Sequence, residues 1–212
     1  AFQYIGQNLS SALTEHSVSQ YIRQSLLENG MEVTDGPVVA VNEHSSDPHY
    51  EPRPDSSVVI KPGDWILIDL WSRLNGQDNI FADITWTAYV GKTIPADYQQ
   101  VFQAVVEARD AAVNALNESF CIGKKISGWE IDKVAREHIS GAGYAKYFNH
   151  RLGHSLGTEV HGKAVNLDGW ETYDVRHIIP GIGVTIEPGV YLPEFGVRSE
   201  INVYVTKSGP QI

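Results

Sequence analysis

Four acidic residues lie within or at the ends of apolar, strand-like stretches of the sequence, where charged side chains are uncommon. They are Asp69, Asp83, Glu187 and Glu200. A bare carboxylate in a core costs several kcal/mol unless it is paired, protonated or bound to a cation. Each one alone could cap a turn or pair with a lysine, but four buried acids in one place would repel one another strongly. Divalent cations would remove this repulsion, because carboxylate oxygens suit Mn, Mg, Fe or Co and one imidazole extends the range to Zn.

A candidate imidazole comes from a glycine- and histidine-rich stretch. His150, His154 and His161 lie within twelve residues there, and His49 lies in a separate Pro48-His49-Tyr50 loop. A lone histidine is more often structural, but three on a glycine-rich segment indicate an active site. The spacing and the glycines differ from those of the HExxH zinc helix.

The helices and strands that must position these residues can be predicted from the spacing of apolar residues and from the capping and turn residues between them. We expect a helix from Thr14, its N-cap, to Gly30, and a helix with a capping box formed by Ser127 and Glu130. The other expected elements are a strand at 36–41, a loop at 42–57, a hairpin of strands at 65–71 and 80–90, a helix at 96–116, the capped helix at 127–140, and β-like runs at 183–192 and 196–205. This order predicts an α+β fold with an antiparallel sheet rather than a parallel βαβ sheet.

Length, net charge and residue composition limit the kinds of partner and the cellular location that we expect for this protein. The 212 residues are enough for one sizeable core. The formal net charge of −10 disfavours nucleic acid and anionic membranes as partners. No apolar run is long enough to span a membrane and no signal peptide is evident, so we expect a soluble, cytoplasmic domain. The single cysteine, Cys121, cannot form an internal disulfide, and its apolar neighbours predict a core position.

Together these motifs resemble the "pita-bread" metallopeptidases, the M24 family of methionine aminopeptidase, aminopeptidase P and prolidase. The resemblance covers nearly the whole chain, and its elements occur in the family's order. They are Pro48-His49-Tyr50, Lys61-Pro62-Gly63-Asp64 leading to Ile68-Asp69, Ala82-Asp83-Ile84-Thr85, the segment from His150 to His161, Thr185-Ile186-Glu187-Pro188-Gly189, and Arg198-Ser199-Glu200. The His150 segment and Glu187-Pro188-Gly189-Val190-Tyr191 are most similar to the proline-specific branch. The resemblance implies a curved antiparallel sheet flanked by helices.

The resemblance also implies a cofactor and a role for each site residue. It implies two divalent metal ions, Mn first and Co, Zn or Fe as alternatives, and a metal-bridging hydroxide that attacks the scissile carbonyl. Asp69 would bind one metal, His154 and Glu187 would bind the other, and Asp83 and Glu200 would bridge the two. Glu187 would also transfer a proton from the attacking water to the leaving nitrogen.

The resemblance also implies roles for residues around the metals. His49 and His161 would contact the carbonyl oxygen, and His150 would line the pocket. Arg198 would orient Asp69, and Arg176 would contact the substrate carboxylate, with an ordinary surface arginine as the alternative for Arg176.

The chain departs from the family pattern around the ligands. Trp86 stands where the family commonly has an arginine, and Leu70-Trp71 stands where it usually has a small residue and a glycine. No ligand is lost, but the departures weaken any transfer of substrate specificity, and we expect them to alter the pocket wall. The resemblance further implies that residues 1–212 are a single catalytic domain, that the family's N-terminal domain is absent from this chain, and that the full-length protein forms a homodimer.

The leading hypothesis is a metallopeptidase that hydrolyses the bond to proline in Xaa-Pro dipeptides or at peptide N-termini. Three alternatives stay open on the sequence. The same fold could act as a methionine aminopeptidase or as a metal-dependent lyase, and the least favoured alternative is a non-catalytic peptide-binding module. Retention of all five ligands argues against the last of these.

Overall fold

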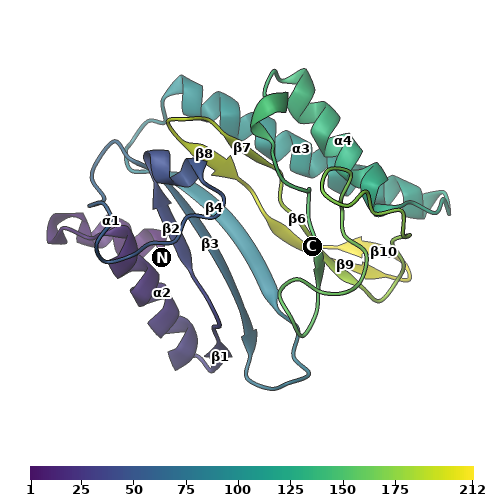
Figure 1. Cartoon of the computed structure of the whole chain (residues 1–212), viewed down its shortest axis with the longest axis horizontal. Helices are drawn as coiled ribbons and strands as arrows, with labels where there is room; N and C mark the ends of the chain where they lie inside the picture. The colour runs from purple at the N-terminus through teal and green to yellow at the C-terminus, as the bar shows by residue number, and fades with distance from the viewer.

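Antiparallel strands from the two halves of the chain form the framework, and helices lie along them (Figure 1). The computed structural model describes residues 1–212. The N-terminal half contains α1 (Phe2–Asn8), α2 (Glu15–Glu28), β1 (Met31–Glu32), β2 (Val38–Val41), β3 (Trp65–Leu74) and β4 (Ala82–Tyr89). The C-terminal half contains α3 (Ala96–Cys121), α4 (Gly128–Gly141), β5 (Ser155–Leu156), β6 (Gly183–Ile186), β7 (Gly189–Tyr191), β8 (Gly196–Arg198), β9 (Ile201–Thr206) and β10 (Gly209–Gln211). Short 3-10 turns occur at Leu9–Ser11, Asn42–Ser46 and Ala145–Tyr147. The predicted α+β class with antiparallel strands is confirmed.

Each half has its own apolar core between helices and strands. In the first half, α1 and α2 pack on β2 and β3 through residues such as Val18, Ile22 and Ile66. In the second half, α3 and α4 pack on β6 to β10 through a larger cluster that includes Leu116 and Ile131. Because the helices cover only one face of the strands, the opposite face remains available for a site.

The helix boundaries follow the capping signals. Thr14 caps α2, and its side chain and that of Ser17 each bond the other's backbone N–H, at 3.1 and 2.8 Å. Helix α2 ends before Gly30, whose φ of 74° is a left-handed conformation that suits glycine. At α4 the predicted capping box is confirmed, since Glu130 accepts a hydrogen bond from the Ser127 N–H at 2.9 Å.

Two helical features were not predicted, and one prediction was wrong. Helix α1 is short and buries only Ile5, which leaves too little periodicity to detect. Helix α3 runs to Cys121 rather than to about residue 116, through a polar last turn. Cys121 is exposed, not in the core, because the buried face of α3 passes through Leu116 and Ser119. None of the helices combines the length and apolar composition needed to cross a membrane.

The hairpin of β3 and β4 decides which side chains share a face. Asp69 lies opposite Thr85, and Trp71 lies opposite Asp83. Residues two apart on a strand share a face, and directly paired residues do too, so these four side chains project to the same side. Trp86 belongs to the other face and is 61% exposed. The expectation that Trp86 alters the pocket wall was therefore wrong.

The late strands form a second long hairpin that is interrupted in both arms at the same level. Strand β6 pairs with β9 up to Ile186 and Ile201, and β7 pairs with β8 from Gly189 and Arg198, in one continuous register. The predicted runs at 183–192 and 196–205 are thus each broken in two. Pro188 lacks an N–H and cannot complete a ladder there. The interruption leaves Glu187 and Glu200 facing each other.

The two hairpins meet edge to edge, between β4 and β9. The Glu200 N–H donates to the Thr85 carbonyl at 3.0 Å. The Asn202 amide donates to the Asp83 carbonyl at 2.6 Å and accepts from the Asp83 N–H at 3.0 Å. This side-chain bridge replaces a regular strand pairing and sets the two acids of the second hairpin beside the two of the first.

A fully buried glutamate at the start of α2 ties the N-terminal half together. Glu15 accepts hydrogen bonds from the Val41 N–H at 2.7 Å, the Val58 N–H at 3.0 Å and the Tyr50 hydroxyl at 2.7 Å, and it pairs with His44 at 2.9 Å. Tyr50 adjoins His49, so this carboxylate also fixes the loop that carries that candidate site residue.

We predict that Glu15→Ala lowers the free energy of unfolding by about 2–5 kcal/mol, because several buried donors lose their acceptor. Urea denaturation measures the change. The control is Glu28→Ala, at the exposed end of the same helix, for which the change should stay within about 0.5 kcal/mol. Equal effects of the two substitutions would contradict the assigned role of Glu15.

Candidate metal centre

The five candidate metal ligands converge on one pocket of about 820 Å³. They are Asp69 on β3, Asp83 on β4, His154 just before β5, Glu187 between β6 and β7, and Glu200 between β8 and β9. One ligand atom from each of Asp83, His154 and Glu200 lies within 4.8 Å of the other two. His154 Nε2 also lies 3.4 Å from Glu187 Oε1 and 3.5 Å from Asp83 Oδ2. The candidate ligands, which are far apart in the sequence, therefore lie together in the structure.

The acids of this cluster keep buried oxygens without a hydrogen-bond donor. Asp69 Oδ1, Asp83 Oδ1 and Glu200 Oε1 have no partner in the protein. A buried carboxylate oxygen without a donor is costly, and natural proteins seldom leave one. All three belong to candidate ligands, and Asp83 and Glu200 each bring a ligand atom within 4.8 Å of one on His154. Carboxylates together with one imidazole are the donor set of a hard or borderline divalent cation. The residues present thus fit a divalent metal site.

Burial and crowding shift the pKa values of these groups. Burial raises the pKa of Glu187 to about 7, although the positive charges of His154 and Arg198 oppose the shift. Burial, with the negative charges of Glu187, Asp83 and Asp69, raises the pKa of Glu200 well above its ordinary range. Burial also raises the pKa of Asp69. Without a cation, the site therefore retains protons that ordinary carboxyls would have released.

Arg198 supplies the one buried guanidinium of the centre. It forms an ion pair with Asp69 through Nη2, donates to the Thr85 hydroxyl through Nε at 2.9 Å, and donates to the Tyr191 hydroxyl through Nη1 at 2.9 Å. All three acceptors are fixed by strands, so the arginine locks Asp69 in one orientation. This contact places Arg198 where the sequence predicted it, beside Asp69.

Two threonines orient candidate ligands and were not singled out from the sequence. Thr85 donates to Glu200 Oε2 at 2.7 Å. Thr185 donates to Glu187 Oε1 at 3.0 Å and accepts from the His154 N–H at 3.0 Å. The signal available was spacing, because each threonine lies two residues from a predicted ligand on the same strand face.

His150 lines the pocket as an acceptor rather than as an acid. Its Nδ1 lies 2.7 Å from the Arg151 carbonyl, so Nδ1 carries the proton, and Nε2 lies 2.8 Å from the Tyr191 hydroxyl. Burial and the nearby charge of Arg198 lower the pKa of His150 to about 3. A neutral His150 thus accepts a hydrogen bond from the Tyr191 hydroxyl and fixes it, and this hydroxyl in turn accepts a hydrogen bond from Arg198.

The other two candidate histidines lie exposed at the pocket wall. The rings of His161 and His154 meet edge to face, with centroids 4.4 Å apart. Partial desolvation of its ring against the pocket wall, with the positive charges of His154 and Arg151, lowers the pKa of His161. His49 follows Pro48, and its N–H is held by Asp47 Oδ1 at 2.9 Å. Both imidazoles are free to meet a bound molecule.

Of the two remaining candidate residues, Trp71 and Arg176, only Trp71 lines the pocket. Trp71 lines the pocket and lies over Gly36, where a β-carbon would come within 2.9 Å of the indole. Arg176 is not part of the pocket wall. It forms a bidentate ion pair with Asp174 and donates to the Lys163 carbonyl at 3.0 Å. The structure therefore does not bring Arg176 to the other candidate residues.

Comparison with known proteins decides the family. Residues 1–207 match metallopeptidase family M24. The chain belongs to this family. M24 members are metal-dependent peptidases that act on peptide substrates, which agrees with the carboxylate and imidazole cluster. A relative from Bacillus subtilis (strain 168), YkvY, is 35% identical over 203 residues, which are 95% of this chain and 51% of the relative.

Solved structures confirm the pita-bread fold of this M24 chain. A dipeptidase from Pyrococcus horikoshii OT3 superposes with a TM-score of 0.81 at 30% identity, over 94% of this chain and 52% of that one. An X-Pro aminopeptidase from Thermotoga maritima MSB8 superposes with a TM-score of 0.83 at 28% identity, over 100% of this chain and 56% of that one. The chain spans about half the length of these relatives, and its description as one catalytic domain stays a prediction.

We predict that the metal-free protein loses stability as the pH rises from about 4.5 to about 7. Between these values folded Glu187 holds a proton that the unfolded chain has released, so raising the pH favours unfolding. The expected fall in Tm is several degrees, measured by differential scanning calorimetry in chelator. Glu187→Gln should give a shallower slope, whereas an identical slope for both proteins would contradict the shifted pKa.

Proposed function

We propose that this protein is a metal-dependent peptidase that hydrolyses the bond to proline in Xaa-Pro dipeptides or at peptide N-termini. The observation that carries the proposal is the set of three buried, unpartnered carboxylate oxygens, on Asp69, Asp83 and Glu200, in the pocket that His154 also lines. Support for the substrate class comes from similarity to a dipeptidase and to an X-Pro aminopeptidase.

The proposed cofactor is a pair of divalent cations, with Mn first and Co, Zn or Fe as alternatives. Asp69 would hold one ion, His154 and Glu187 the other, and Asp83 and Glu200 would bridge them. When bound, such ions lower the pKa of a shared water and polarise the scissile carbonyl. Arg198, Thr85 and Thr185 keep these carboxylates in orientation through the contacts described above.

The chain's own side chains supply the proton transfers and the carbonyl contacts. Glu187 would take a proton from the attacking water and deliver it to the leaving nitrogen of proline. His49 and His161, exposed at the pocket wall, would donate hydrogen bonds to the carbonyl oxygen as negative charge develops there. His150 would act by fixing Tyr191 and, through it, Arg198.

We predict that hydrolysis of Ala-Pro or of an Xaa-Pro peptide requires added Mn, Co or Zn and stops in chelator. Glu200→Gln and Asp83→Asn should lower kcat about 100-fold or more, because the charge stabilisation at stake is worth several kcal/mol. A chromatographic assay over Xaa-Pro, Met-Xaa and non-prolyl peptides measures the rates.

The matched control for these variants is Glu51→Gln, a pocket-lining acid outside the cluster, whose kcat should stay within about twofold. Three results would oppose the proposal. They are cleavage of Met-Xaa peptides in preference to Xaa-Pro, activity that persists in chelator, and no cleavage of any peptide by the metal-loaded protein.

A further inference from the structure

Trp71 is the largest apolar side chain on a pocket wall that is otherwise mostly polar or charged. Apart from prolines, the other apolar side chains on this wall are Val38, Tyr50 and Val160, and the Tyr50 hydroxyl donates to Glu15. Trp71 is half-buried, so part of its indole faces the pocket. An apolar surface inside a polar cleft favours an apolar occupant, because covering it removes that surface from water.

Strand register places Trp71 directly beside two of the candidate metal ligands. It pairs with Asp83 across the hairpin of β3 and β4, and it lies two residues after Asp69 on β3. The β-carbons of directly paired residues lie about 4.5–5.5 Å apart, and residues two apart on a strand share a face. Trp71 therefore adjoins both acids on the face of the hairpin that lines the pocket.

The segment behind the indole is held in place. The six-membered ring of Trp71 lies over Gly36, where a β-carbon would meet three ring atoms at 2.9, 3.2 and 3.3 Å. The φ of Gly36 is 63°, a conformation that suits glycine. Arg23 donates to the Gly36 carbonyl at 3.2 Å, and the Ser19 hydroxyl donates to the Pro37 carbonyl at 2.6 Å. The indole is thus backed by a fixed backbone and forms a rigid wall.

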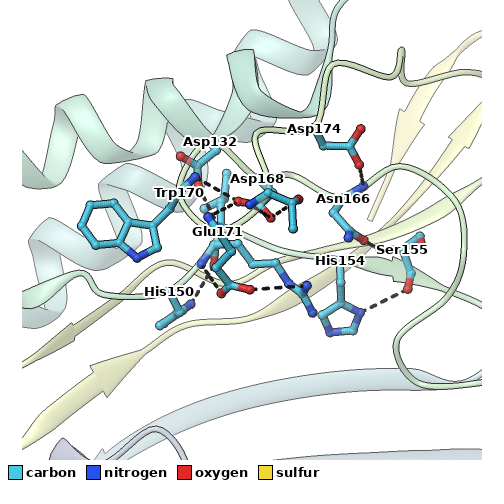
Figure 2. A network of polar contacts seen from close by, with 12 residues as sticks. Asp132, His150, His154, Ser155, Asn166, Asp168, Trp170, Glu171 and Asp174 are labelled. Carbon is cyan, nitrogen blue, oxygen red and sulfur yellow. Dashed lines mark hydrogen bonds and ion pairs between the residues drawn. The ribbon is translucent and has the colours of Figure 1, made fainter.

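Glu187 and His154 lie on the opposite side of the cluster from Trp71. Strand β3 pairs with β4, β4 meets β9, and β9 pairs with β6. Asp83 on β4 therefore lies between Trp71 on β3 and Glu187 after β6. Figure 2 shows the His154 ring directed toward the Ser155 carbonyl, which lies 3.2 Å from Nδ1. This contact leaves Nε2 of His154 for Glu187, whose Oε1 is 3.4 Å away.

This arrangement gives an Xaa-Pro substrate a direction in the pocket. In the proposed reaction Glu187 delivers a proton to the proline nitrogen, so the proline lies toward Glu187 and His154. The residue before proline then extends to the other side of the scissile carbonyl, where Trp71 lies. Because consecutive Cα atoms are only about 3.8 Å apart, the side chain before the scissile bond is within reach of a wall residue that adjoins Asp83.

We propose that Trp71 forms the wall of the subsite for the residue before proline, and that this wall makes the protein select large apolar or aromatic residues there. The inference rests on the proposed Xaa-Pro hydrolysis and names the preferred Xaa. The wall belongs to this chain rather than to the M24 pattern, which usually has a glycine at the position of Trp71 and therefore no side chain to contact the substrate.

The test compares Phe-Pro, Gly-Pro and Arg-Pro as substrates of the Mn-loaded protein. The wild type should prefer Phe-Pro over Gly-Pro by about 10- to 100-fold in kcat/KM, the range expected for burying a large apolar side chain. Trp71→Ala should remove most of this preference by raising KM for Phe-Pro, with kcat/KM for Gly-Pro within about twofold. A purely structural role of Trp71 would lower both values alike, so their ratio separates the two roles.

Trp71→Phe tests the shape of the subsite, and it keeps an aromatic ring against Gly36 should Trp71→Ala not fold. Its smaller ring leaves more room, so kcat/KM for Trp-Pro relative to Phe-Pro should rise about threefold or more. An unchanged ratio would count against the proposal. The matched control is Trp86→Ala. Trp86 is the other tryptophan of the hairpin and lies exposed on its outer face, so this variant should leave every ratio unchanged.

Three results would overturn the inference while leaving Xaa-Pro hydrolysis intact. They are a wild type that cleaves Phe-Pro and Gly-Pro alike, a preference for Arg-Pro over Phe-Pro, and equal losses for Phe-Pro and Gly-Pro in Trp71→Ala. If the wild type cleaves none of the dipeptides, the proposed function fails instead. Calorimetric titration of Phe-Pro and Gly-Pro into wild type and Trp71→Ala then decides the role of Trp71, and equal binding of the two dipeptides by both proteins would refute it.

Discussion

Electrostatic repulsion among buried carboxylates is the constraint around which the structure is arranged. The four acids of the cluster lie around one buried arginine, Arg198, and three of their oxygens have no donor. The internal positive charge is therefore too small to balance the acids, and the raised pKa of Glu200 reflects this deficit. Divalent cations satisfy both the charge and the unpartnered oxygens, which is why the metal site accounts for the cluster better than a structural ion-pair network does.

The backbone places these acids through two hairpins with fixed registers. In the first, continuous pairing sets Asp69 diagonal to Asp83 on one face. In the second, the ladder breaks at Pro188 so that Glu187 and Glu200 face each other. The bridge between Asn202 and the Asp83 backbone then joins the hairpins. Precision at the centre comes from strand pairing, and the helices serve to bury the opposite faces.

Much of this could be predicted from sequence, because the informative residues break local rules. Acids in apolar strands and glycine-spaced histidines indicated the cluster, and the capping residues Thr14 and Ser127 indicated two helix starts. What could not be predicted depends on the exact strand register and on which of its neighbours a long side chain contacts. Trp86 falls on the outer face by strand register, and the Arg176 guanidinium pairs with Asp174 outside the pocket.

The proposed function requires that Asp69, Asp83, His154, Glu187 and Glu200 hold two cations. The most direct measurement is anomalous X-ray scattering at the manganese edge from crystals grown with Mn. We expect two peaks in this pocket, both contacted by Asp83 and Glu200, with Asp69 on one and His154 and Glu187 on the other. A single peak, or peaks that lie outside these five residues, would contradict it.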